Sequence, residues 1–184
     1  MDGSPPKLKG VEKRDIKIVD YDSKWPALFE KHAKIIADAL GSAARRIEHM
    51  GSTSVPGLAA KPIIDVIVVV KDSADESVYL RRLEAAGYVL RVREPDWHEH
   101  RMVRTPVLDV HVHVFSVGCT ETTRQLAFRN RLRRNEGDRL RYQSLKQELA
   151  KGSWLDMNAY ARAKTAVVEE ITARALEEDA GPRP

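Results

Sequence analysis

One run of residues constrains the fold of this chain more than any other. Residues 63–70 read IIDVIVVV, so seven of eight positions are branched aliphatics and Asp65 is the only charge. A continuous apolar run of this length is typical of a strand that is buried on both faces. A carboxylate inside such a strand costs several kcal/mol unless it is paired or metal-bound. The run therefore predicts a core strand and a functional role for Asp65. The alternative is a structural ion pair of Asp65 with Lys61 or Arg104.

Strands and helices are mixed along the rest of the chain. Helical apolar spacing predicts a helix that is capped by Asp22 or Ser23 and ends at Gly41, and a second helix over 74–86. β-Branched and alternating segments predict further strands at 16–19, 45–49, 88–93, 98–104 and 108–114.

The C-terminal third has a different character. Residues 120–176 are expected to form two or three helices, with breaks at Gly137 and Gly152. Strands mixed with helices and then a helical end indicate an α+β or α/β sheet with a C-terminal helical extension. We expect a domain over 15–176, whose helical part is 120–176, between flexible tails at 1–14 and 177–184.

Composition narrows the class of protein. Of the 184 residues, 42% are hydrophobic, which excludes wholesale disorder, and 32% are charged. No apolar run approaches the ~18 residues that span a bilayer, and no apolar segment follows the first lysines as a signal peptide requires. The single Cys119 excludes an internal disulfide and a multi-cysteine zinc site. We expect a cytoplasmic protein without a membrane partner.

Positive charge is concentrated in one segment. Eight basic and three acidic residues lie between Thr120 and Lys146, a net charge of +5, whereas the whole chain carries +4. The basic residues are Arg124, Arg129, Arg131, Arg133, Arg134, Arg139, Arg141 and Lys146. They form either a solvated helix face or a contact surface for phosphate or nucleic acid. Phe128 is the single aromatic residue between Arg124 and Arg141, so there is little aromatic surface among these arginines to stack bases, and nucleic acid is the weaker alternative.

A loop of turn residues precedes the core strand. Gly51 frees the backbone to turn its N–H groups inward, and the hydroxyls of Ser52, Thr53 and Ser54 add donors, so the loop can form a concave anion site. An ordinary turn is the alternative. Because Asp65 follows this loop closely along the chain, the loop and the Asp65 side chain can face one cleft.

Polar residues alternate along the last predicted strand. In DVHVH, the period of two places Asp109, His111 and His113 on one face of the sheet. Carboxylate and imidazole groups on neighbouring positions can hold a divalent metal or move a proton. The alternative is a strand whose polar face is exposed to solvent. The HEHR segment at 98–101 could form a second wall of the same cleft, or a solvent-exposed hairpin at the edge of the sheet.

The motif from Ile47 to Asp65, IEHMGSTSVPGLAAKPIID, closely resembles the signature of the GrpB family. The similarity extends to VDY at 19–21, WP at 25–26, HVHV at 111–114, FRN at 128–130, and residues 142–149 and 160–164. The resemblance implies a nucleotidyltransferase-like fold, in which a mixed β-sheet is flanked by helices and followed by a helical tail. Members of this family also occur fused to dephospho-coenzyme A kinase.

The resemblance also implies roles for individual residues. Gly51 and Ser52 would hold the phosphates of a nucleotide, with Thr53, Ser54 and Lys61 as further binding residues of the motif. Asp65 would be a catalytic residue and metal ligand for Mg²⁺ or another divalent metal. Asp109 would be the second carboxylate, assisted by His111 as a catalytic residue or His113 as a ligand.

One departure from the superfamily pattern leaves alternatives open. Active members usually carry two acids two residues apart on the first strand, but Ile63 and Ile67 flank Asp65 here. We therefore expect either a metal-dependent nucleotidyltransferase that binds a nucleotide or another phosphorylated small molecule, or a non-catalytic module that kept the fold and lost the second carboxylate. A set formed by His49, His111 and His113 with Asp65 or Asp109 would favour a transition metal.

Overall fold

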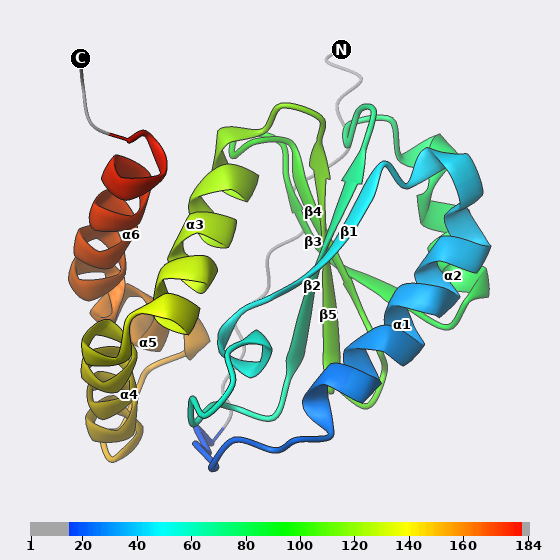
Figure 1. Cartoon of the computed structure of the whole chain (residues 1–184). Helices are drawn as coiled ribbons and strands as arrows, with labels where there is room; N and C mark the ends of the chain where they lie inside the picture. The colour runs from blue at the N-terminus through cyan, green and yellow to red at the C-terminus, as the bar shows by residue number, and fades with distance from the viewer. Residues whose placement is uncertain (1–14, 182–184) are drawn as a thin grey trace.

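A five-stranded mixed sheet lies at the centre of the computed structural model, which describes residues 15–181 (Figure 1). The strands are β1 (Arg46–Met50), β2 (Ile64–Val70), β3 (Val89–Glu94), β4 (His100–Arg104) and β5 (Val110–Ser116), in the spatial order β1-β2-β5-β4-β3. Only β2 and β5 are parallel neighbours. Their register pairs Asp65 with His111 and Ile67 with His113, so these polar side chains share one face.

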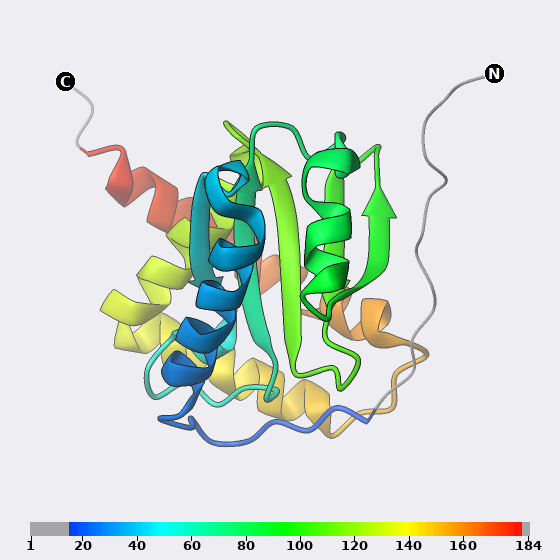
Figure 2. The ribbon, with the colours of Figure 1, turned by 90° about the vertical axis from the view of Figure 1, so that its right-hand side faces the viewer.

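Helices cover both faces of the sheet. The helices α1 (Trp25–Leu40) and α2 (Leu80–Ala85) pack against one face, as Figure 2 shows from their side. The opposite face, which we call the α3 face, packs Ile67, Val69 and Phe115 against α3 (Thr120–Arg134). Burial on both faces explains the unbroken apolar run of β2 and confirms that prediction.

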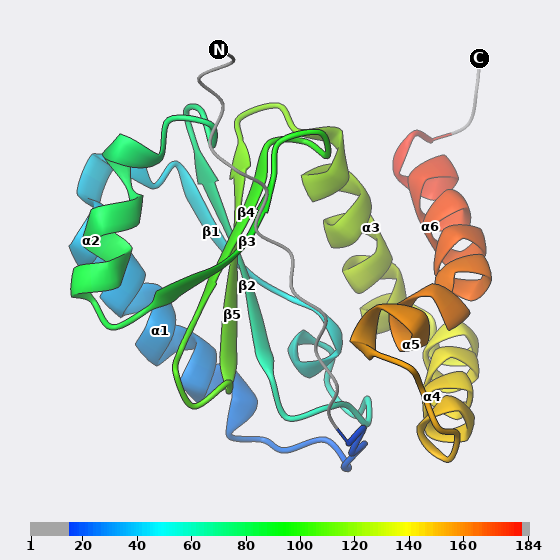
Figure 3. The ribbon, with the colours of Figure 1, turned by 180° about the vertical axis from the view of Figure 1, so that it is seen from behind.

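The remaining helices extend the α3 side into a separate layer. They are α4 (Glu136–Ala150), α5 (Met157–Ala163) and α6 (Thr165–Asp179), of which α4 and α6 lie beyond α3 as seen from the sheet (Figures 1 and 3). Three short 3₁₀ turns complete the described elements: η1 (Gly41–Ala43), η2 (Ser52–Ser54) and η3 (Glu76–Val78). The predicted α+β fold, with a mixed sheet flanked by helices and a C-terminal helical extension, is confirmed.

Several predicted boundaries are wrong in detail. Residues 177–179, assigned to a flexible tail, continue α6, where Glu178 and Asp179 pair with Arg131 and Arg134. Gly137 does not break a helix, because the break falls at Asn135, whose side chain accepts a hydrogen bond from the Asp138 backbone N–H. The proposed tail 1–14 and residues 182–184 lie outside the described residues.

Three segments towards the N-terminus also differ from expectation. Residues 16–19 contribute one isolated bridge, between Val19 and Ala60, and no strand. The helix expected over 74–86 is divided into η3 and α2. The first helix begins at Trp25, and the Asp22 carboxylate accepts only from the Lys24 N–H. None of the described helices is long and apolar enough to cross a membrane.

The basic segment is used inside the molecule. Arg129 donates to Glu48 at 2.7 Å and to the His49 carbonyl at 2.8 Å, which joins α3 to β1. Arg133 donates two hydrogen bonds to the Ser54 carbonyl, at 3.0 and 2.7 Å. The other six basic residues of the segment also have protein partners, which are Glu121, Asp138, Asp179, Leu132, Glu170 and Ser52. The contacts of Arg133 and Lys146 fasten α3 and α4 to the loop that leads into β2, whereas, apart from Arg129, the other five join residues of the helices to one another.

The Arg129 contacts predict a measurable contribution to stability. We expect Arg129→Met to lower the free energy of unfolding by about 1–3 kcal/mol, because Glu48 and the His49 carbonyl lose a charged donor. Urea denaturation measures the change. The control is Arg124→Met on the same helix, because Arg124 is largely exposed and its ion pair with Glu121 is 3.5 Å long; it should cost at most about 0.5 kcal/mol. Equal losses in the two variants would show that Arg129 does not anchor α3.

Candidate functional site

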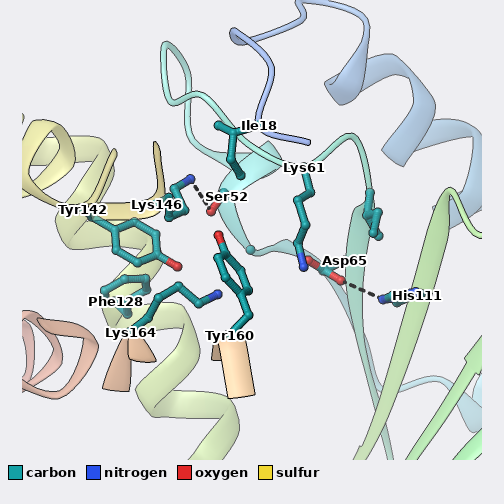
Figure 4. Close-up of a pocket in the computed structure, with 12 residues that line it drawn as sticks. Ile18, Ser52, Lys61, Asp65, His111, Phe128, Tyr142, Lys146, Tyr160 and Lys164 are labelled. Carbon is teal, nitrogen blue, oxygen red and sulfur yellow. Dashed lines mark hydrogen bonds and ion pairs between the residues drawn. The ribbon is translucent and has the colours of Figure 1, made fainter. Parts of the chain in front are cut away.

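A cavity of about 180 Å³ lies between the α3 face of the sheet and the helical layer (Figure 4). The sheet side contributes Gly51, Ser52, Lys61, Asp65 and His111. The helical side contributes Phe128 from α3, Tyr142 and Lys146 from α4, Tyr160 from α5, and Lys164 from the α5–α6 junction. The cavity therefore forms only where the two layers meet.

A carboxylate and two imidazoles meet on the sheet side. Asp65 Oδ1 lies 3.5 Å from His111 Nδ1 and 3.7 Å from His113 Nε2. One ligand atom from each residue lies within 4.8 Å of the others, so the three side chains could hold a metal ion. Burial alone would raise the pKa of Asp65, but the His111 imidazole beside it holds that pKa well below its usual range. The cluster brings together three of the residues predicted from sequence.

The predicted second carboxylate is not part of this cluster. β5 begins at Val110, and Leu108 adopts a left-handed backbone with φ of 67° just before it. The strand alternation therefore does not extend to Asp109, whose carboxylate accepts a hydrogen bond from the Thr105 hydroxyl at 2.6 Å. The placement of Asp109 beside Asp65 was wrong because it assumed that the strand started two residues earlier.

His49 also lies apart from the cluster. Its register partner on β2 is Val66, which faces the α1 side of the sheet, and its ring stacks on Phe29 at 4.6 Å. Burial and the nearby Arg133 charge lower the pKa of His49 to about 4, so this residue is a neutral core histidine. The alternative metal set that included His49 is therefore not assembled.

The loop residues predicted to hold phosphate divide into two groups. Ser52 lines the cavity, and its Oγ accepts a hydrogen bond from Lys146 Nζ at 3.0 Å. Thr53 and Ser54 are buried and bind within the loop, where their hydroxyls donate to the carbonyls of Ile63 and Gly51. Their side chains shape the turn, whereas Ser52 faces the space in which a ligand could lie.

Gly51 allows the loop to approach Asp65. Its φ is +72°, a left-handed conformation that favours glycine, and a Cβ at this position would lie 2.5 Å from Asp65 Oδ2. Two reasons therefore favour glycine at this position: the left-handed backbone conformation and the space occupied by the Asp65 carboxylate. Gly51 brings the loop and the carboxylate into one site, as predicted from the order of the two motifs.

Three lysines line the cavity beside the cluster. Lys146 lies 4.8 Å from the ring centroid of Tyr142, and Lys164 and Lys61 lie 4.5 and 5.1 Å from that of Tyr160. Burial, and then the charges of the neighbouring lysines, lower the pKa of Lys146 to about 7. Burial and then Lys61 lower that of Lys164 to about 8. Mutual repulsion of this kind is relieved when an anion enters between the ammonium groups.

Two polar atoms of the lining are buried without a partner. Tyr160 Oη and His111 Nε2 make no hydrogen bond to any residue in the described part of the chain. Tyr160 is only 1% exposed, and its hydroxyl points towards Ser52 in Figure 4. Because buried polar groups are rarely left unpaired, both atoms are suited to a ligand in the cavity.

Sequence reasoning missed most of the helical wall. Tyr142, Lys146, Tyr160 and Lys164 were not candidate site residues, since they lie far from Ser52 and Asp65 along the chain. A signal for them was present, because residues 142–149 and 160–164 are among the segments that resemble the GrpB family. Lys146 also belongs to the basic segment for which a phosphate contact was one interpretation.

The whole described domain matches a known protein family. The family model described as GrpB protein covers residues 15–174. The chain belongs to the GrpB family. A UPF0157 protein of Halalkalibacterium halodurans is 51% identical to this family member over 160 residues, which are 87% of this chain and 82% of that relative. The glutamate-rich protein GrpB of Alkalihalophilus pseudofirmus is 30% identical, over 89% of this chain and 98% of its own length.

A solved GrpB structure supports the same fold. The crystal structure of the conserved protein GrpB from Enterococcus faecalis matches with a TM-score of 0.79 and 33% identity, over 88% of this chain and 98% of that one. A dephospho-CoA kinase of Mycolicibacterium paratuberculosis is 33% identical over 81 residues, which are 42% of this chain and 20% of that enzyme. The GrpB membership inferred from the motif at 47–65 is confirmed.

A matched pair of glycines tests the contact between the loop and Asp65. Gly57 also has a positive φ, of +76°, but a Cβ there would meet nothing within 4 Å. We expect Gly57→Ala to cost about 1–2 kcal/mol of unfolding free energy through backbone strain alone. Gly51→Ala should cost about 1–3 kcal/mol more, because the methyl group also overlaps Asp65. Urea denaturation compares them, and equal costs would refute the close approach.

The buried lysines predict that stability rises with pH. In the unfolded chain lysine titrates near ~10.4, so above pH 7 the unfolded state binds more protons than the folded state does. We expect the unfolding free energy to increase from pH 7 to pH 9 as Lys146 and Lys164 lose their protons in the folded state. Urea denaturation at several pH values measures this, and Lys146→Met should flatten the rise. An identical slope in wild type and Lys146→Met would contradict the lowered pKa of Lys146.

Proposed function

We propose that this GrpB family member binds a nucleotide or another phosphorylated small molecule, with its phosphates between the lysines and a divalent cation held by Asp65, His111 and His113. The finer proposal is transfer of a nucleotidyl group, which is the reaction implied by resemblance to the nucleotidyltransferase superfamily. The observation that carries the proposal is the placement of three ammonium groups and a carboxylate–imidazole cluster around one cavity.

Opposite charges around a small space suit a phosphate group. Lys146, Lys164 and Lys61 supply donors to phosphate oxygens, and the Ser52 hydroxyl lies beside them. A divalent cation at the cluster would neutralise negative charge on the same phosphates. The Tyr160 hydroxyl, which has no hydrogen-bond partner among the described residues, adds a further donor.

The size of the cavity limits what it encloses. Pockets for whole small molecules usually measure about 300–1,000 Å³, which exceeds the 180 Å³ found here. The enclosed part of the ligand is therefore the phosphate group, and a nucleoside or other organic part would extend towards the mouth. Recognition of phosphate supports nucleotides and other phosphorylated molecules alike.

The second candidate is a binding module without catalytic activity. The position two residues after Asp65 on β2, where active superfamily members place another acid, is occupied by Ile67. Ile67 is fully buried and packs with Phe115 and Leu126, so the structure uses this position for the hydrophobic core. A single strand carboxylate is consistent with a protein that holds a phosphorylated molecule without transferring it.

Calorimetry tests the binding proposal. Wild type is titrated with pyrophosphate, nucleoside diphosphates and nucleoside triphosphates, each with Mg²⁺, Mn²⁺ or Zn²⁺. We expect Lys146→Met to weaken binding roughly 10–100-fold through loss of one charged donor. Lys151→Met is the control, because Lys151 follows the last turn of α4 and is exposed. No heat from any ligand with folded protein would refute phosphate binding.

A turnover assay separates the two candidates. If the protein is a nucleotidyltransferase, pyrophosphate is released from a nucleoside triphosphate in the presence of an acceptor, and Asp65→Asn abolishes the release. If it is a binding module, wild type and Asp65→Asn give the same background although calorimetry shows binding to wild type. The assay is run over a panel of hydroxyl and amine acceptors.

A further inference from the structure

A line of polar contacts runs from the edge of the sheet to the carboxylate–imidazole cluster. Glu94 Oε2 lies 2.9 Å from His100 Nδ1, and His100 Nε2 lies 3.0 Å from His113 Nδ1. Glu94 and His100 are register partners on β3 and β4, and His113 is on the neighbouring β5. The chain Glu94–His100–His113 thus reaches the site from outside the cavity lining.

The geometry determines which nitrogen carries each proton. A carboxylate only accepts, so His100 Nδ1 donates to Glu94. His100 is 4% exposed and packs against Phe115 and Trp97, and in the tautomer that donates through Nδ1 its Nε2 is an acceptor. His113 Nδ1 must therefore donate to it. The two imidazole planes differ by 16°, with centroids 5.2 Å apart, which agrees with an in-plane N–H contact to a lone pair.

This proton arrangement leaves the lone pair of His113 Nε2 directed at the cluster. The atom that it faces, Asp65 Oδ1 at 3.7 Å, is also an acceptor, and the distance is too long for a hydrogen bond. Two ligands of one tetrahedral ion at about 2.1 Å each would lie about 3.4 Å apart. The spacings of 3.5 and 3.7 Å from Asp65 to His111 and His113 are close to this value.

We propose that Glu94 and His100 are positioning residues that hold His113 as a metal ligand through Nε2, and that the site takes an imidazole-preferring transition-metal ion such as Zn²⁺ and not Mg²⁺. This inference deepens the proposed function, since it names the class of cation at the same site. In such sites, a histidine that binds the metal through one ring nitrogen usually donates the N–H of its other ring nitrogen to a fixed acceptor.

The donor set supports this class of ion. Mg²⁺ prefers hard oxygen ligands in octahedral geometry, whereas Asp65 is the only carboxylate in the cluster and two of its three ligands are nitrogens. Two imidazoles and one carboxylate also leave coordination positions open, as catalytic metal sites do. Since His111 and Asp65 line the cavity, those positions are available to a phosphate oxygen.

Metal binding without any phosphorylated ligand tests the choice of ion. The full chain, freed of metal by a chelator, is titrated with Zn²⁺ in competition with a chromogenic chelator, and the titration is repeated in excess Mg²⁺. We expect one Zn²⁺ per chain, undisturbed by Mg²⁺ and lost in His113→Ala. Absence of Zn²⁺ binding, or displacement of Zn²⁺ by Mg²⁺, would overturn the inference.

Variants at His100 test the positioning role. We expect His100→Leu to weaken Zn²⁺ binding by about 10–100-fold, because His113 loses its acceptor and the ring is no longer fixed. His100→Gln should recover much of the affinity, since its side-chain carbonyl can accept from His113 Nδ1. The exposed neighbour His98 gives the control His98→Leu, which should bind as wild type does. Equal affinity in His100→Leu and wild type would refute the role.

Nuclear magnetic resonance gives a readout that does not depend on the variants folding. Long-range ¹⁵N–¹H spectra of the metal-free wild type should show His100 and His113 both protonated on Nδ1. Protonation of His113 on Nε2, alone or as imidazolium, would overturn the inference. The two proposals fail separately: Zn²⁺ binding without phosphate binding refutes only the proposed function, and phosphate binding with Mg²⁺ but no Zn²⁺ binding refutes only this inference.

Discussion

The structure depends on keeping a carboxylate charged within an apolar sheet. Asp65 lies on β2, which is buried on both faces of the sheet, and burial disfavours its ionised form. The His111 imidazole on the parallel neighbour β5 compensates for the lost hydration, and Gly51 leaves room for the carboxylate beside the loop. Two features of the fold therefore accommodate the Asp65 carboxylate. The strand order places β5 beside β2, and the positive φ of Gly51 lets the loop pass close to the carboxylate.

Arginine side chains give the helical layer its position. Arg129 and Arg133 reach from α3 to carbonyls on either side of Gly51–Ser52, and so fasten α3 to β1 and to the loop. Lys146 and Tyr160 can then face Asp65 although they come from a different layer. The arginines of the basic segment thus contribute to the site through packing, and Lys146 is the one basic residue of the segment that lines the cavity itself.

How far the sequence predicts the site depends on the distance over which residues interact. Strand alternation is local, so it correctly placed His111 and His113 on one face, but it failed for Asp109, where a left-handed Leu108 delays the strand. The pairing of β2 with β5 could be expected only from the resemblance to a known fold. The contact between Lys146 and Ser52 spans 94 positions, and no spacing rule indicates it.

The division of the site between two layers has a consequence for how the protein behaves in solution. A phosphorylated ligand that contacts Lys146 and the Asp65 cluster together bridges the sheet and the helical layer, which are joined covalently only through the short β5–α3 connection. Binding of the ligand in the cavity and packing of the helical layer on the sheet are then thermodynamically linked, because each favours the other. Such a ligand would therefore stabilise the docked arrangement of the sheet and the helical layer.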